Sequence, residues 1–157
     1  MGYTTDFQGQ FDLNPTLSEE QVTYLLNFSN SRRMKRDVSI LEKNFGPCNN
    51  IMGTYGEEGE FFVDDIEDDS VIEHNYPPKT QPGLWCQWIP TEGGQELIWD
   101  GGEKFYDYVE WLEYLIKSFF NPWKIKISGV VRWQGEEFSD RGKITVKNNE
   151  IFTEILE

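Results

Sequence analysis

The sequence predicts an α+β fold: an antiparallel sheet of about five or six strands with two helices, the longer of which, at about residues 103–120, packs on one face of the sheet. Polar and apolar residues alternate from Tyr3 to Leu13, which is typical of a strand with one buried face. Apolar residues recur every three or four positions from Phe105 to Phe119, as on the inner side of a helix. Near the end of the chain, the strand-like segments 143–147 and 150–155 flank Asn148-Asn149, a pair that tolerates the positive φ of a tight hairpin turn.

The first helix is expected to begin after Ser18. Pro15 interrupts the chain before it, and Ser18 followed by Gln21 forms the pattern of a capping box. Polar residues then weaken the helical pattern, so the helix either ends near Asn30 or continues to Arg36.

Residues 44–82 form the least regular stretch, because glycine and proline recur throughout it. Short apolar pieces such as Glu60–Val63 lie between them, and we expect one short strand and mostly loop. The segment Asp64–Asp69 is expected to be a solvated, mobile acidic loop. Its acids are not spaced like those of a calcium-binding loop.

A second group of strands is predicted around the long helix. Gly83–Pro90 places aromatic residues on both faces, which favours a central strand, and a short turn connects it to Glu96–Trp99 as a hairpin partner. The sequence from Asp100 to Glu103 resembles a helix N-cap, and Asn121-Pro122 should end the helix. The alternation in residues 125–133 indicates another half-buried strand.

The net charge of −14 is concentrated in the middle of the chain. Residues 44–123 contain sixteen Asp or Glu against three Lys, and this segment alone carries −13. Such a field repels nucleic acid and attracts basic partners, so direct nucleic-acid binding is not expected. The acids either keep an aromatic-rich protein soluble or form a functional surface.

Residues 1–157 are predicted to form a single cytoplasmic domain. The length is that of one domain, no apolar run approaches the roughly 18 residues needed to span a bilayer, and the N-terminal residues do not resemble a secretory signal. Cys48 and Cys86 lie in unlike contexts, so two reduced thiols are expected, with a disulfide as the alternative. No membrane partner is expected.

The sequence contains no recognisable catalytic constellation. His74 is the single histidine, the two cysteines lack zinc-ligand spacing, and neither a phosphate-binding loop nor a dinucleotide-binding glycine motif is present. Carboxylates are so numerous that the sequence does not single out any pair as a catalytic acid and base. We therefore expect a protein without catalytic residues, cofactors or metal ligands, and an enzyme with a carboxylate-bound metal remains the alternative.

Two features are candidates for ligand binding. The basic cluster Arg32-Arg33-Met34-Lys35-Arg36 must either pair with carboxylates of its own chain or meet an external anion. In Gly83–Pro90, alternation puts Trp85 and Trp88 on opposite faces, so one indole is a candidate for exposure. An exposed indole with an amide and guanidinium groups would suit a nucleotide. The candidate ligand contacts are Arg32, Arg33, Arg36, Trp85, Gln87 and Trp88.

Four motifs resemble those of a widespread family of small uncharacterised bacterial and bacteriophage proteins. They are RRMKR at 32–36, PGLWCQWIP at 82–90, WDGGEKFY at 99–106 and WQGE at 133–136, so the resemblance covers nearly the whole chain. The resemblance implies no catalytic residue. By analogy with small phage-type proteins, it implies binding to a host component and blocking it.

The sequence therefore favours a non-catalytic binding protein that acts by sequestration. Its ligand would be a host protein or a nucleotide-type signal, as in a phage inhibitor of host defence. The main alternative uses the acidic middle segment, which would imitate nucleic acid and occupy the cleft of a basic host protein. The ligand, the host and the oligomeric state do not follow from the residues.

Overall fold

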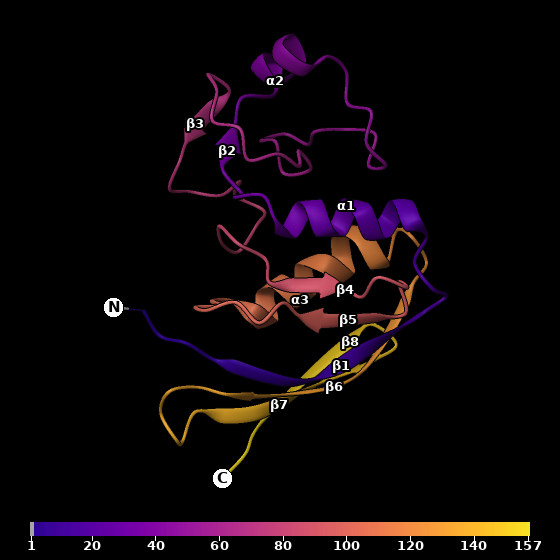
Figure 1. The fold of residues 1–157 in the computed structure, drawn as a ribbon, viewed down its shortest axis with the longest axis vertical. Helices are drawn as coiled ribbons and strands as arrows, with labels where there is room; N and C mark the ends of the chain where they lie inside the picture. The colour runs from indigo at the N-terminus through magenta and orange to yellow at the C-terminus, as the bar shows by residue number, and fades with distance from the viewer. Residues whose placement is uncertain (1) are drawn as a thin grey trace.

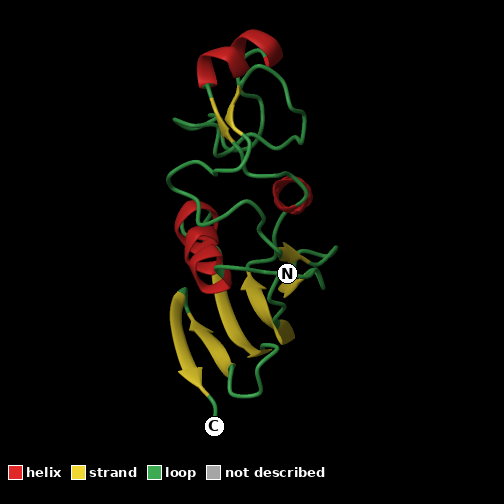
Figure 2. Ribbon diagram, turned by 90° about the vertical axis from the view of Figure 1, so that its left-hand side faces the viewer, coloured by secondary structure: helices red, strands yellow, loops and turns green. Residues whose placement is uncertain are grey.

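The computed structural model describes residues 2–157 and has an α+β architecture, as the sequence predicts (Figure 1). An antiparallel six-stranded sheet has the strand order β4-β5-β1-β6-β7-β8, and the helices lie on one side of it (Figure 2). Its strands are β1 (Asp6–Asn14), β4 (Trp88–Pro90), β5 (Glu96–Trp99), β6 (Lys126–Gln134), β7 (Arg141–Lys147) and β8 (Glu150–Ile155). The remaining elements are α1 (Glu19–Ser29), β2 (Lys35–Arg36), α2 (Val38–Phe45), β3 (Val71–Glu73), α3 (Tyr108–Leu115) and its π-helical continuation η1 (Ile116–Phe120).

Strand β1 is central and follows the predicted alternation. Its side chains Phe7, Phe11 and Leu13 are buried, whereas the intervening polar residues face solvent. It pairs with β6 over its whole length and with β5 on the other side. Because the sheet carries helices on one side alone, its strands keep one apolar and one polar face.

The start of helix α1 is confirmed by its hydrogen bonds. The Ser18 hydroxyl accepts from the Gln21 backbone N–H (3.1 Å), and the Gln21 side chain accepts from the Ser18 N–H (2.9 Å), which completes the capping box. Of the two predicted ends, the shorter is correct, with Asn30 as the C-cap. The Ser31 hydroxyl then donates to the Asn27 carbonyl at 2.7 Å, in place of a further helical turn.

The long helix begins later than predicted. Asp107, in the left-handed region with φ of 57°, precedes α3, so the expected N-cap at Asp100–Glu103 is wrong. The Asp100 carboxylate instead accepts from the Gly102 N–H at 2.7 Å in a turn. Phe105 is buried ahead of the helix, which explains why it fits the apolar spacing without being helical. The predicted end at Asn121 is confirmed.

The prediction of a central strand at Gly83–Pro90 is wrong. Within Gly83–Pro90 the paired residues are Trp88–Pro90, and they form the edge strand β4 rather than a central strand. Helix α1 packs along β4, in which Trp88 is buried, whereas Trp85 lies before the strand and is 40% exposed. The prediction of mostly loop with one short strand in residues 44–82 is confirmed, since β3 is that strand and the apolar piece Glu60–Val63 is turn and loop.

A third helix, α2, was missed. Asp37 caps it by accepting from the Ile40 N–H at 3.2 Å, and Val38, Leu41 and Phe45 have the helical spacing that could have revealed it. Helix α2, the β2–β3 pair and the loops around them form a smaller layer above α1 (Figure 1).

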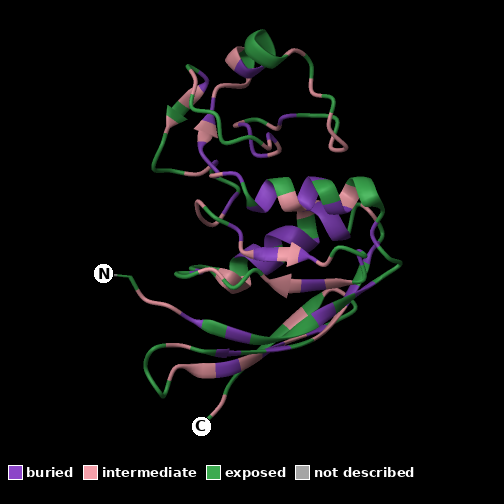
Figure 3. Cartoon of the chain, in the orientation of Figure 1, coloured by how far each residue is buried: buried purple, intermediate pink, exposed green. Residues whose placement is uncertain are grey.

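Two apolar clusters hold these layers. The larger lies between α1, α3 and the helix-facing side of the sheet, and is rich in aromatic rings in edge-to-face contact such as Phe28 with Trp111. The smaller consists of Leu41, Tyr55 and Phe62 beneath α2. Figure 3 shows the buried residues concentrated between the helices and the sheet, with long exposed stretches in the upper layer.

The predicted C-terminal hairpin is confirmed. Asn148 and Asn149 have φ of 47° and 72°, and the flanking residues Lys147 and Glu150 pair across β7 and β8. The Asn149 side chain accepts from the Ile127 N–H at 2.7 Å and donates to the Ile125 carbonyl at 3.0 Å, which ties the turn to β6.

Candidate functional site

Arg33, the second residue of the basic cluster, lies in the interior. It is 2% exposed, and its Nη2 donates to the carbonyls of Glu60 (2.7 Å) and Phe62 (2.9 Å). Its guanidinium also stands 4.2 Å from the centre of the Phe28 ring. Burial removes water from the Arg33 guanidinium and lowers its pKa. Within residues 2–157, no carboxylate forms an ion pair with Arg33 that would offset this effect. Arg33 therefore connects α1 to the loop above it.

Arg36 is also internal and is paired with the acidic segment. It is 2% exposed; Nη1 lies 3.4 Å from the Asp68 carboxylate and Nη2 donates to the Ile66 carbonyl at 2.6 Å. Lys35 pairs with Glu58 at 3.1 Å. The expected pairing of the basic cluster within the chain is confirmed at these two positions. The segment Asp64–Asp69, expected to be a mobile loop, is held by these contacts.

Arg32, like Lys35, is a half-buried member of the basic cluster. Its Nε donates to the His74 carbonyl at 3.0 Å, and its Nη2 lies 3.3 Å from the Asn75 side-chain oxygen. Its backbone N–H donates to Asp65 at 2.5 Å. The side chain therefore braces the loop that follows β3, and part of its guanidinium remains open to solvent.

Of the two tryptophans in the 83–90 segment, one is exposed, as predicted. Trp88 is 2% exposed and donates its indole N–H to the Tyr108 carbonyl at 2.8 Å, whereas Trp85 is 40% exposed. Gln87 is engaged within the chain, since its side chain accepts from the Trp99 indole (3.1 Å) and donates to the Glu103 carbonyl (2.8 Å).

The six candidate contacts are thus not brought together as one site. Arg33, Arg36 and Trp88 are buried with internal partners, and Trp85 is the exposed aromatic. Within residues 2–157, none of the six lines any of the surface hollows described below. The two segments meet at the backbone, where the Arg33 N–H donates to the Leu84 carbonyl at 2.9 Å, but the guanidinium groups of Arg33 and Arg36 bind partners within the chain.

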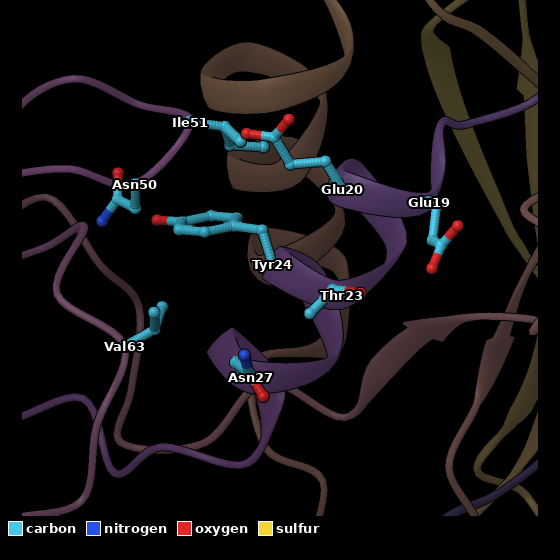
Figure 4. Close-up of a pocket in the computed structure, with 8 residues that line it drawn as sticks. All are labelled: Glu19, Glu20, Thr23, Tyr24, Asn27, Asn50, Ile51 and Val63. Atoms are coloured by element: carbon cyan, nitrogen blue, oxygen red, sulfur yellow. The ribbon is translucent and has the colours of Figure 1, made fainter.

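A groove that the sequence did not predict lies between helix α1 and the loop above it. This hollow, here called the α1 groove, has a volume of about 510 Å³ (Figure 4). It is lined by Glu19, Glu20, Thr23, Tyr24, Asn27, Asn50, Ile51 and Val63. Figure 4 shows Glu20, Tyr24 and Asn27 on the helix, with Asn50, Ile51 and Val63 on the facing loops.

The floor of the α1 groove is fixed by one carbonyl. The Tyr24 hydroxyl and the Asn50 side-chain amide both donate to the Phe61 carbonyl, each at 3.0 Å. Asn50 also accepts from the Met52 N–H at 2.9 Å, which folds its loop into a turn. Burial raises the pKa of Tyr24 far above its ordinary value, so this hydroxyl stays protonated and keeps donating. The groove is therefore preformed.

The helix side of the α1 groove carries polar groups that are free to meet a ligand. Glu19, Glu20, Thr23 and Asn27 are exposed, and their side chains form no hydrogen bond or ion pair with any other described residue. The opposite wall is apolar, with Ile51 and Val63 packed against the main core. No Lys or Arg lies among the lining residues. The groove thus has an acidic rim, hydrogen-bonding groups along one side and an apolar wall.

Part of this site is visible in the sequence. Glu20, Tyr24 and Asn27 are spaced by four and three residues, which places them on one side of a helix. The facing wall comes from residues 23 to 43 positions later, and no local pattern indicates that those loops return to α1. Arg33 brings them back by binding the carbonyls of Glu60 and Phe62.

Comparisons with protein-family models, with curated proteins and with solved structures gave no match to this chain. In the described residues, no group of three or more His, Cys, Asp or Glu side chains is placed to hold a metal ion. None of the helices described in residues 2–157 has the length and apolar character required to cross a bilayer. Cys48 and Cys86 are both free thiols.

Proposed function

We propose that this chain is a non-catalytic binding protein that captures a basic segment of a partner protein in the α1 groove. The observation that carries the proposal is the combination of the uncommitted Glu19 and Glu20 with the apolar Ile51 and Val63 in one preformed hollow. Lysine and arginine side chains combine a cationic end with an apolar stem, so they match both parts of this lining.

The charge of the whole molecule supports the same class of partner. A net charge of −14 attracts cationic partners over about a Debye length and speeds their association. A nucleotide ligand is less well supported, because Arg33 and Arg36 are each 2% exposed and bind backbone carbonyls within the chain. Occupying the basic surface of a host protein would block that surface, which is how sequestration would act.

Charge removal at the groove tests the proposal. The double change Glu19→Gln and Glu20→Gln should weaken binding of a labelled Lys- and Leu-containing octapeptide by about 3- to 10-fold, since exposed ion pairs contribute roughly 0.2–1 kcal/mol each. The affinity is measured by fluorescence anisotropy at low salt, and added NaCl should weaken it further.

A matched control separates the groove from the overall charge. Glu110→Gln with Glu137→Gln removes the same charge from exposed positions outside the α1 groove and should change the affinity by less than twofold. The single change Val63→Ser should also weaken binding by removing part of the apolar wall. Equal weakening by both double variants would show non-specific attraction and would refute the groove as the site.

A further inference from the structure

The two edges of the main sheet differ in how they are protected. Strand β4 at one edge has three residues, includes Pro90, which has no N–H to offer, and is covered by helix α1. Strand β8 at the other edge has six residues with no proline or lysine, and it pairs with β7 without a break in register. Figure 2 shows β8 as the outermost strand of the sheet. Sheet edges are normally blunted, because an open edge recruits another strand.

The hydrogen-bonding side of β8 can be read from its pairing. The Leu156 N–H donates to the Arg141 carbonyl at 2.9 Å, so even-numbered residues direct their backbone groups toward β7. Because these directions alternate along a strand, the N–H and C=O groups of Ile151, Thr153 and Ile155 point outward. These three alternate residues offer unpaired N–H and C=O groups to which a further strand can bind.

The same three residues leave the apolar face of the sheet unfinished. Ile151 and Thr153 lie opposite Val146 and Ile144 of β7, which are 1% and 0% exposed, so all four share the helix-facing side. The helices that bury Val146 and Ile144 do not bury the same face of β8, and Ile155 is 72% exposed. A groove of about 460 Å³ separates β8 from α3 and η1, with Val109 and Ile116 on its helix side and Ile151 and Thr153 on its strand side.

We propose that β8 pairs antiparallel with β8 of a second copy of this chain, around a twofold axis at Thr153. The outward backbone groups belong to odd-numbered residues, so odd-numbered residues of one copy must lie opposite odd-numbered residues of the other. When the full strand pairs, this condition places the twofold axis at Thr153 or at Phe152. An axis at Phe152 would place Glu150 opposite Glu154 of the second copy, and like charges directly opposite are destabilising. An axis at Thr153 places Glu154 opposite Phe152 and sets Ile151 beside Ile155.

This pairing completes both unfinished features. It joins the two six-stranded sheets into one continuous sheet and satisfies the outward backbone groups of β8. It also brings Ile155 of each copy beside Ile151 of the other, at the mouth of the groove next to α3. Since each copy carries −14, their long-range repulsion opposes association, and added salt should raise the dimer fraction. The inference does not rest on the proposed function.

Sedimentation velocity on the full chain tests the pairing. The wild-type protein should shift from monomer toward dimer as its concentration rises to about 0.5 mM, because a single strand pair is a small interface. Thr153→Lys and Thr153→Glu should each reduce the dimer fraction at least fivefold, since each places like charges across the axis. A 1:1 mixture of the two variants should restore the dimer by opposing Lys to Glu.

Controls keep the outcomes distinct. Thr145→Lys adds the same charge on the polar face of β7, away from the edge, and should dimerise like the wild type. Melting curves establish that each variant is folded. A wild-type chain that stays monomeric throughout the concentration range, or a variant mixture that stays monomeric while the wild type dimerises, overturns the proposed pairing. The Glu19 and Glu20 variants should leave dimerisation unchanged, so failure of the peptide experiment does not affect this one.

Discussion

At the scale of single residues, Arg33 shows how a charged group can serve as a structural connector. Its guanidinium is desolvated, which costs free energy, yet it satisfies two backbone carbonyls of a loop that has little regular structure of its own. The Phe28 ring on one side compensates part of the lost hydration. The residue thereby fixes the wall of the α1 groove from behind.

Replacing Arg33 should destabilise the chain more than replacing its neighbour. Arg33→Ala leaves the buried Phe62 carbonyl without its donor and removes one of the two donors to the Glu60 carbonyl, so it should lower the free energy of unfolding by about 3 kcal/mol. Arg33→Met should lose less, because it restores the volume and removes the buried charge. Urea denaturation followed by tryptophan fluorescence measures both. Arg32→Ala, at the half-buried position, is the control and should cost less than about 1 kcal/mol; equal losses at both positions would contradict the connector role.

At the scale of elements, the acidic segment and the basic strand β2 stabilise one another. Asp68 accepts from Ser70 and from Asn44, and lies beside Arg36. Burial alone would raise the pKa of Asp68, but these hydrogen bonds and the Arg36 charge lower it. The pKa of Glu58 is lowered chiefly by the hydrogen bond from the Lys79 N–H, with Lys35 adding to the effect. Part of the central acidity is therefore internal counter-charge.

These shifts predict a loss of stability in acid. Because the pKa values of Asp68 and Glu58 are lower in the folded chain than in the unfolded one, the unfolded chain binds protons first as the pH falls. The stabilisation is complete above the ordinary value of 4.5 for Glu58 and is lost progressively below it. Melting temperatures measured from pH 7 to pH 3 should fall most steeply below about pH 4.5.

Asp68→Asn provides the matched control for the acid effect. It should melt at a lower temperature than the wild type at pH 7, since it loses the charge beside Arg36. The difference should shrink as the pH falls below the ordinary value of 3.8 for Asp68, because the unfolded wild type then binds a proton at Asp68 that the variant cannot bind. A difference that stays constant with pH would argue against the ion pair as its source.

At the scale of the whole molecule, the two cysteines lie in different layers and differ in burial. Cys86 is 1% exposed in the main core, and burial raises the pKa of its thiol to about 12. Cys48 is half-buried beside the small cluster of Leu41, Tyr55 and Phe62. Only an opening of the main core exposes the first, whereas a local opening of the upper layer suffices for the second.

Thiol titration should separate these two events. With a chromogenic disulfide reagent at pH 8, one thiol per folded chain should react quickly, and the second should react after unfolding in urea. Cys48→Ser should abolish the fast phase and leave the slow one. Two fast thiols in the folded chain would mean that the main core opens as readily as the upper layer.

The sequence by itself determined the fold class, β1, the start of α1, the hairpin at Asn148-Asn149 and the pairing of β4 with β5. Each of these depends on residues close together in the chain, where alternation, capping and turn conformation act directly. The exposure of one of the two indoles, Trp85, was also expected from local alternation. Helix α2 was equally local, and its apolar spacing was overlooked.

The tertiary structure alone decided where the charged and aromatic candidates lie. Arg33 and Arg36 are buried because distant carbonyls and carboxylates surround them, and the Phe105 ring is buried ahead of its helix. The α1 groove exists because residues 50–63 return to a helix formed by residues 19–29. The edge position of β8 depends on the order of all six strands. Such contacts join residues far apart in the chain, so local periodicity does not predict them.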